Sequence, residues 1–187
     1  MRTAIAAVLA LATLVGVAGC ESNAQPAAMK ILGYQVDADR SVWLTRDGVL
    51  IHSAARPPQL VALPDWIYVG APYCPPGLAL GPNGEILVTS NVLPTVWRIE
   101  SGTLAVTVHP LALDVDRDRD VGFAAVAYVA EQRAFVAYSE TQRSLWKIDP
   151  DLKTAEKIAP AEFNRPRSGK ARSTSCADLA RRLNLGE

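Results

Sequence analysis

The sequence predicts an all-β chain of about three repeated four-stranded units, followed by a short C-terminal helix. Three tryptophan-containing segments recur along the 187 residues, at spacings of 54 and 49 residues. Short apolar runs separated by turn-forming residues flank each segment, which is typical of strands. Hydrophobic residues make up 49% of the chain, and 19 basic side chains balance 19 acidic ones, as in a globular protein. This charge balance excludes the strongly basic surface of a nucleic-acid binder.

Three sets of segments repeat along the chain, the first strands of the units aligning only roughly. The tryptophan segments are VWLTRDGVL at 42–50, VWRIESGTL at 96–104 and LWKIDPDLK at 145–153. Upstream, EILVTS at 85–90 matches AFVAYS at 134–139, and GLALG at 77–81 lies where FAAVAY at 123–128 does. Each unit therefore reads as an innermost apolar strand, a second strand ending in Ser, a strand containing Trp, and a final strand. For the first unit the sequence predicts no innermost strand.

Turn residues separate these strands where a hairpin requires them. The second unit has Pro82-Asn83-Gly84 and Ser101-Gly102, and the first has Asp47-Gly48. Units of four strands over about 40–50 residues are typical of β-propeller blades. We therefore predict a propeller-like domain over residues 30–160.

One segment, GLALGPNGEILVTSNVLPTVWRIE at 77–100, resembles the NHL and senescence-marker/gluconolactonase-like propeller repeats. This resemblance implies a propeller fold, but propellers close with at least about four blades. Three units leave three possibilities: an arc capped by the C-terminal tail, a six-unit ring completed by a second copy, or a β-sandwich-like packing. The capped arc is favoured.

The tail, residues 161–187, is basic and contains the candidate cap. Ser175 and Asp178 have the spacing of a capping box. One helical face would carry Cys176, Leu179, Ala180 and Leu183. The basic charge could meet anionic lipid or an acidic partner, or fold back on the acidic body.

The N-terminus reads as a secretory signal peptide over residues 1–19, with Arg2 before an apolar run that ends in small residues. Val17-Ala18-Gly19-Cys20 resembles the bacterial lipobox, which implies acylation of Cys20, an anchor in the lipid bilayer and a periplasm-facing domain. Residues 20–29 then form a polar tether. Glu21, not Asp, after the Cys implies sorting to the outer membrane. The alternative is an ordinary signal peptide in which Cys20 is incidental.

Cys74 and Cys176 remain as a pair in a chain exported to an oxidising compartment. A disulfide between them is favoured over two separate buried thiols or a redox pair, because the spacing fits neither C-x-x-C nor a metal site.

Catalytic and metal motifs find little support. An acidic cluster is a candidate for binding calcium; its carboxylates are Asp114, Asp116, Asp118 and Asp120. The cluster lacks the Gly and the acidic residue at the twelfth position of an EF-hand loop, so a solvated loop is favoured. His52 and His109 have no companion ligands for zinc. The gluconolactonase resemblance implies a metal held by one Glu, two Asn and one Asp. Of these ligands only one Asn has a matching position, at Asn91 of the second unit. The equivalent position of the third unit carries Glu140. No cofactor is predicted.

The stretch at 64–76 interrupts the repeat, and loops that interrupt a scaffold often carry function. Its aromatic residues Trp66, Tyr68 and Tyr73 form the predicted contact surface. The recurring Trp43, Trp97 and Trp146 are assigned to packing between units rather than to stacking on a ligand. The sequence thus favours a non-enzymatic, lipid-anchored binding or scaffold protein with an envelope protein partner or a second copy. The alternative is a metal-dependent lactonase-like hydrolase, degenerate or completed by dimerisation.

Overall fold

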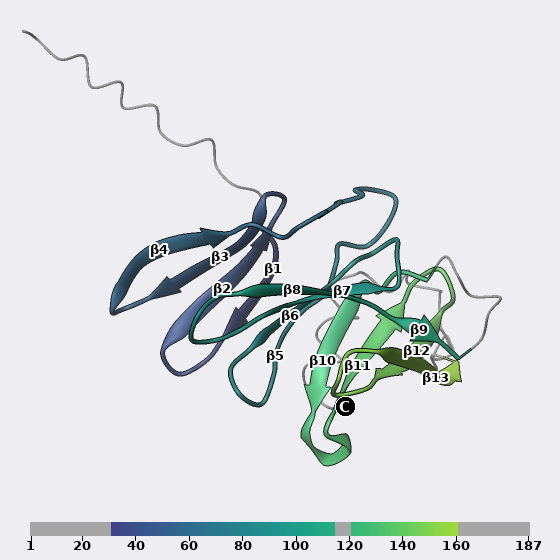
Figure 1. The fold of residues 1–187 in the computed structure, drawn as a ribbon. Helices are drawn as coiled ribbons and strands as arrows, with labels where there is room; N and C mark the ends of the chain where they lie inside the picture. The colour runs from purple at the N-terminus through teal and green to yellow at the C-terminus, as the bar shows by residue number, and fades with distance from the viewer. Residues whose placement is uncertain (1–30, 115–120, 161–187) are drawn as a thin grey trace, which may run out of the picture.

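The computed structural model describes residues 31–114 and 121–160, which form three antiparallel sheets (Figure 1). Sheet 1 contains β1 (Ile31–Val36), β2 (Arg40–Thr45), β3 (Gly48–Ser53) and β4 (Arg56–Val61). Sheet 2 contains β5 (Leu78–Leu80), β6 (Ile86–Thr89), β7 (Thr95–Ile99) and β8 (Val106–Pro110). Sheet 3 contains β10 (Ala125–Val129), β11 (Ala134–Ser139), β12 (Ser144–Ile148) and β13 (Thr154–Pro160), with the short 3-10 turn η2 (Ala130–Gln132) after β10. The prediction of an all-β chain of four-stranded units is confirmed.

Sheet 3 has a fifth strand that the repeats did not predict. β9 (Ala112–Leu113) comes from the segment after sheet 2 and pairs in parallel with β13. Its backbone amide at Ala112 donates to the Lys153 carbonyl at 2.8 Å. The chain leaving sheet 2 thus closes the outer edge of sheet 3 before it enters the innermost strand.

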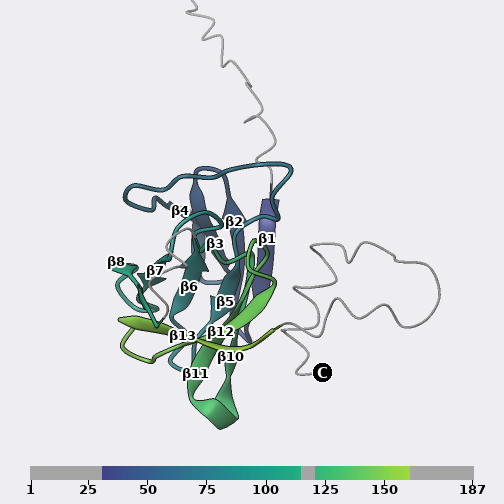
Figure 2. The same cartoon turned by 90° about the vertical axis from the view of Figure 1, so that its right-hand side faces the viewer.

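The innermost strands β1, β5 and β10 lie side by side, which gives the array its propeller-like arrangement (Figures 1 and 2). Gln35 on β1 donates from Nε2 to the Leu78 carbonyl on β5 at 3.1 Å. The prediction that the first unit lacks an innermost strand is therefore wrong. Residues 31–36 carry no copy of the GLALG pattern, so their strand is identified only by its pairing with β2.

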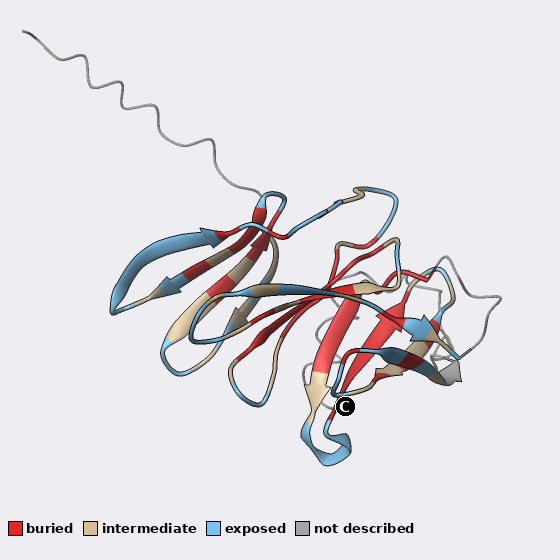
Figure 3. Cartoon of the chain, in the orientation of Figure 1, coloured by how far each residue is buried: buried red, intermediate tan, exposed pale blue. Residues whose placement is uncertain are grey.

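The sheets pack through alternating side chains, as expected when both faces of a strand are buried. The inner face of sheet 1, with Val42 and Leu44, packs on the face of sheet 2 that carries Trp97. The other face of sheet 2, with Leu87, packs on the face of sheet 3 that carries Trp146. Figure 3 shows the buried residues gathered in the middle of the array, with exposed residues along β4.

The three aligned tryptophans do not share one structural position. Trp97 and Trp146 lie on β7 and β12, the third strands of their sheets, and are 3% and 0% exposed. Trp43 lies on β2, the second strand of sheet 1, and is half-buried on the opposite face of that sheet from the core. A short apolar-Trp-apolar pattern does not distinguish the second strand of a sheet from the third. The sequence alignment therefore placed Trp43 one strand away from its actual position.

On the outer face of sheet 3, turned away from sheet 2, the side chains of β10 and β11 are also buried. Ala127 and Val136 are each 5% exposed and Tyr138 is 3% exposed. The predicted cap, the tail at 161–187 with its short helix, lies outside the described residues, as do the signal peptide and the tether. Within the described ranges, no helix is long and apolar enough to span a bilayer.

Candidate functional site

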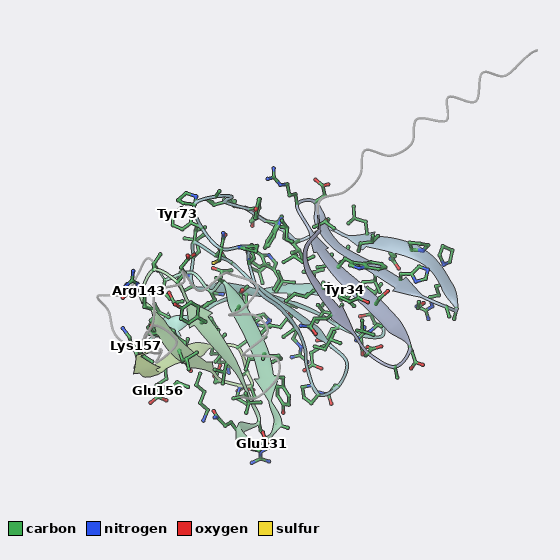
Figure 4. The ribbon with its side chains drawn as sticks, turned by 180° about the vertical axis from the view of Figure 1, so that it is seen from behind. Tyr34, Tyr73, Glu131, Arg143, Glu156 and Lys157 are labelled. Carbon is green, nitrogen blue, oxygen red and sulfur yellow. The ribbon has the colours of Figure 1, made fainter. Side chains whose placement is uncertain are left out.

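The segment that interrupts the repeat forms a loop over residues 62–77, between β4 and β5. Figures 1 and 2 place this loop at the end of the molecule where the chain enters β1. Figure 4 shows Tyr73 at that end and Glu131, beside the β10–β11 turn, at the opposite end. The loop is therefore well placed to meet a partner without involving the sheets.

Two of the three predicted contact residues hold the loop on the sheets. The ring of Trp66 meets Trp97 edge-on with centroids 5.1 Å apart, and its Nε1 donates to the Arg46 carbonyl at 3.0 Å. The Arg46 guanidinium lies over the ring of Tyr68, 4.8 Å from its centroid. Both aromatic side chains are half-buried, so they serve mainly to hold the loop on sheets 1 and 2.

Three large apolar side chains of this region are exposed, beside the exposed carboxylate of Asp65. Tyr73, the third predicted contact residue, is 43% exposed, and Ile67 is 57% exposed. Leu93, in the neighbouring β6–β7 loop, is 47% exposed. Sequence reasoning missed Ile67 and Leu93 because a single aliphatic residue in a loop carries no periodic signal. We call Ile67, Tyr73 and Leu93 the loop patch.

The loop is held from beneath by two residues at equivalent positions of successive units. Asn91 follows β6 and donates from Nδ2 to the carbonyls of Val69, at 2.7 Å, and Cys74, at 3.1 Å. Glu140 follows β11 and accepts a hydrogen bond at Oε2 from the Cys74 amide at 2.7 Å. These two residues are the positions that the gluconolactonase resemblance singled out. Here they clasp the backbone of one loop residue, which fixes the loop patch relative to both sheets.

Cys74 is 2% exposed and disulfide-bonded. Its predicted partner, Cys176, lies outside the described residues, so the pairing stays a prediction. A disulfide at this residue adds a covalent restraint to the clasp made by Asn91 and Glu140.

Replacing Asn91 with alanine is expected to lower the free energy of unfolding by about 2–3 kcal/mol, because two loop carbonyls lose their donor at a buried position. Protease cleavage within residues 62–77 should become faster. Urea unfolding and limited proteolysis measure the two effects. Asn83→Ala is the matched control, since Asn83 is exposed and should change the stability by less than about 0.5 kcal/mol. Equal behaviour of the two variants would contradict the clasp.

The residues at the clasp do not fit the lactonase-like metal centre. Oδ1 of the buried Asn91 has no hydrogen-bond partner, so one oxygen donor is available. Glu140 supplies a carboxylate, but one of its oxygens is engaged by Cys74. No group of three His, Cys, Asp or Glu side chains converges within residues 31–114 and 121–160. One amide and one partly engaged carboxylate fall short of a four-ligand set.

The remaining candidates lie apart from the loop. Asp114 is exposed and accepts hydrogen bonds from the Lys157 amide, while the other three carboxylates of the acidic cluster, Asp116, Asp118 and Asp120, lie outside the described residues. His52 lies beside Trp43 on sheet 1. Burial, and then the charge of Arg98, lower the pKa of His109.

A cleft lies between sheets 2 and 3, near the β10–β11 turn. Arg98, Tyr128 and Arg133 are among the residues that line its volume of about 120 Å³. A site for an organic ligand usually exceeds about 300 Å³, so this cleft suits only water or a small ion.

Comparisons with known proteins support the fold. No protein family and no curated protein matches the chain. Among solved structures, streptogramin B lyase superposes with a TM-score of 0.55 at 15% identity, covering 78% of this chain and 44% of the lyase. The dihydro-heme d1 dehydrogenase NirN superposes with a TM-score of 0.51 at 17% identity, covering 70% of this chain and 28% of NirN.

A third solved structure, a Bacteroides thetaiotaomicron protein of unknown function, superposes with a TM-score of 0.52 at 18% identity, covering 78% and 37% of the two chains. The chain thus spans less than half the length of each of these structures. At such low identity the likeness concerns the fold alone. The lyase and NirN are β-propellers, so the predicted propeller-like architecture is confirmed.

Proposed function

We propose that this protein is a lipid-anchored, periplasm-facing binding or scaffold protein that holds an envelope protein through its loop patch. The observation that carries the proposal is the clasped loop, in which three hydrogen bonds from the side chains of Asn91 and Glu140 fix a backbone that presents Ile67 and Tyr73 to solvent. Exposed aliphatic and aromatic side chains on a preorganised loop are typical of a protein contact, because little conformational entropy is lost on binding.

The position of the loop supports this proposal. The loop at 62–77 and the start of β1 lie at the same end of the molecule (Figures 1 and 2). If Cys20 is acylated, the tether at residues 20–29 spans at most about 36 Å when fully extended. The loop patch would then stay close to the bilayer, where envelope proteins are concentrated, and no further targeting signal is needed.

Anchoring is tested by growing bacteria that express the full chain with an alkyne-labelled fatty acid. We expect label on the wild-type chain, recovery in the outer-membrane fraction, and loss of the label in Cys20→Ser. Cys74→Ser is the matched control and should keep the label. An unlabelled wild-type chain would overturn the lipid anchor but would leave the loop patch to be tested separately.

Partner binding is tested with a photo-crosslinking amino acid placed at Tyr73 in the full chain in intact cells. We expect an adduct with one envelope protein, reduced at least tenfold by Ile67→Glu, because a carboxylate in an apolar contact must be desolvated. The same probe at Glu131, exposed at the opposite end, is the control and should not form this adduct. Adducts that are equal from both positions would contradict a specific contact at the loop patch.

The metal-dependent lactonase-like hydrolase is the alternative prediction. It requires a divalent ion with ligands beyond Asn91 and Glu140. Native mass spectrometry of the full chain with and without chelator tests it, and a bound divalent ion lost on chelation would favour the enzyme over the binding protein.

A further inference from the structure

Sheet 1 has an outer face, turned away from sheet 2, that carries a continuous apolar row. The register places Tyr34 opposite Trp43, Trp43 opposite Leu50, and Leu50 opposite Leu60, so each of the four strands contributes one residue. The rings of Tyr34 and Trp43 stack with centroids 5.9 Å apart. Tyr34 and Leu60 are 53% and 44% exposed.

Two further residues extend this row. Val36, two residues along β1 from Tyr34, is 55% exposed, and His52 on β3 lies with its ring 6.2 Å from that of Trp43. We call the six residues the outer face of sheet 1; they are Tyr34, Val36, Trp43, Leu50, His52 and Leu60. None of them is Asp, Glu, Lys or Arg. A contiguous apolar patch of several hundred Å² on a protein surface is often a binding site.

The outer face of sheet 1 corresponds to the face of sheets 2 and 3 that is turned toward the preceding sheet, and in both of those sheets this face is covered. In sheet 2 this face carries Trp97 and Ile99, which are buried under sheet 1. In sheet 3 it carries Trp146 and Ile148, which are buried under sheet 2. The outer face of sheet 1 has the same kind of side chains, a Trp among aliphatic residues, but no preceding sheet in the described chain. By continuity with these two interfaces, its partner is another four-stranded sheet.

Within the described residues, the other sheet faces are already in use. The inner face of sheet 1 and both faces of sheet 2 form the two cores. On the outer face of sheet 3, Ala127, Val136 and Tyr138 are buried within the single chain, so these side chains are not available for contact with sheet 1 of another copy. This argues against the six-unit ring, which needs a head-to-tail contact between sheets 1 and 3. The face that remains is the outer face of sheet 1 of a second copy.

We propose that two copies of this chain pair through the outer faces of their first sheets, in a two-fold symmetric contact. Such contacts are the commonest among homo-oligomers, and a face without acidic or basic side chains meets its own copy without repulsion between like charges. Packed sheets align their strands within about 30°, which brings the stacked Tyr34 and Trp43 of one copy against the row of the other. The contact does not require the lipid anchor or the loop patch, which lies elsewhere on the chain.

The size of the face predicts a weak dimer. Four strands spaced about 4.8 Å apart make the face roughly 19 Å wide, and six residues that each rise about 3.3 Å make it roughly 20 Å long. The face therefore covers about 400 Å² on each copy. A total near 800 Å² lies below the roughly 1,200–2,000 Å² of stable interfaces and within the range of weak, transient contacts, so we expect a reversible dimer that forms at high local concentration. Copies confined to one membrane would meet that condition.

Photo-crosslinking in intact cells that express the full chain tests the pairing. A probe at Leu60 is expected to give an adduct of twice the chain mass with this same chain on both sides of the crosslink. The matched control is a probe at Val108 on β8, which is 39% exposed but outside the face, and it should give at least tenfold less of this adduct. Adducts with lipid, adducts with another protein, or no dimer from Leu60 would each overturn the proposal.

Charge substitutions at the middle of the face make the test sharper. Leu50→Glu and Leu50→Lys should each reduce the Leu60 adduct at least tenfold, because like charges would meet across the two-fold axis. Coexpression of the two variants should restore it as a mixed dimer, and failure to do so would count against a self-contact. Should either variant melt at a lower temperature, Val36→Glu repeats the test at a side chain that is already exposed in a single copy. Val108→Glu, on β8 and outside the face, should leave the adduct unchanged.

Discussion

Trp146→Ala is expected to lower the free energy of unfolding by about 3–5 kcal/mol, because it removes a fully buried indole from the contact between sheets 2 and 3. Trp146 is 0% exposed and meets the ring of Phe123 edge-on at 6.1 Å. Its Nε1 donates to the Ser144 hydroxyl at 2.9 Å, so the variant also leaves a buried hydroxyl with one partner fewer. The cavity cannot collapse readily because rigid strands surround it on both sides.

Trp43→Ala is the matched control for this prediction. Trp43 aligns with Trp146 in the sequence but lies on another strand and is half-buried, so we expect a loss below about 2 kcal/mol. Urea unfolding of the full chain, followed by circular dichroism, measures both values. Equal losses would mean that the two residues are structurally equivalent after all, and would contradict the strand assignment of sheet 1.

Gly122→Ala is expected to cost about 3 kcal/mol or more, because the new methyl group would collide with backbone atoms. A Cβ at Gly122 would lie inside the van der Waals radii of the Asn91 carbonyl carbon and oxygen and of the Val92 nitrogen. Neither neighbour can move as a flexible side chain could. Relief requires the strand entering sheet 3 to separate from the end of β6.

That separation would break the hydrogen bonds that join sheets 2 and 3 at this point. The Phe123 amide donates to the Ser90 carbonyl at 2.6 Å, and the Thr89 hydroxyl donates to the Phe123 carbonyl at 2.6 Å. The variant should therefore also loosen the loop at 62–77 through the displaced Asn91. Unfolding by urea and proteolysis of the loop measure the two effects.

Gly102→Ala serves as the control for the collision. Gly102 lies in the exposed β7–β8 turn, and no atom comes within 4 Å of a Cβ built there. Its substitution should change the free energy of unfolding by less than about 0.5 kcal/mol. If Gly122→Ala is as mild as Gly102→Ala, the two sheets are not joined as tightly at Asn91 as the structure indicates.

Local patterns were sufficient to predict most of the strands. The repeated EILVTS and AFVAYS blocks correctly located β6 and β11, because an apolar run bounded by turn residues has few alternatives to a buried strand. The Asp47-Gly48 pair correctly marked the β2–β3 turn. Gly48 has a φ of 134° there, a conformation that residues with a side chain rarely adopt. The same local patterns could not reveal β1, which carries no copy of the repeated pattern, or β9, which has only two residues; each is identified by its pairing with a neighbouring strand.

For the candidate site, the sequence identified the interrupting loop but not how it is used. The contacts by which Trp66 and Tyr68 hold the loop could not be read from the sequence, and the exposed Ile67 and Leu93 were missed. Asn91 and Glu140 were marked by their equivalent positions in two units, but their shared contact with Cys74 could not be read from spacing.

The sequence by itself determined the all-β class, the repeated four-stranded unit and most turns, because these depend on periodicity and on residues with special backbone preferences. Only the tertiary structure decided which face of each strand is covered. It alone placed Trp146 in a core, Trp43 on an open face and Asn91 under a loop. Burial depends on what lies across from a side chain, and that neighbour comes from a distant part of the chain or from another molecule.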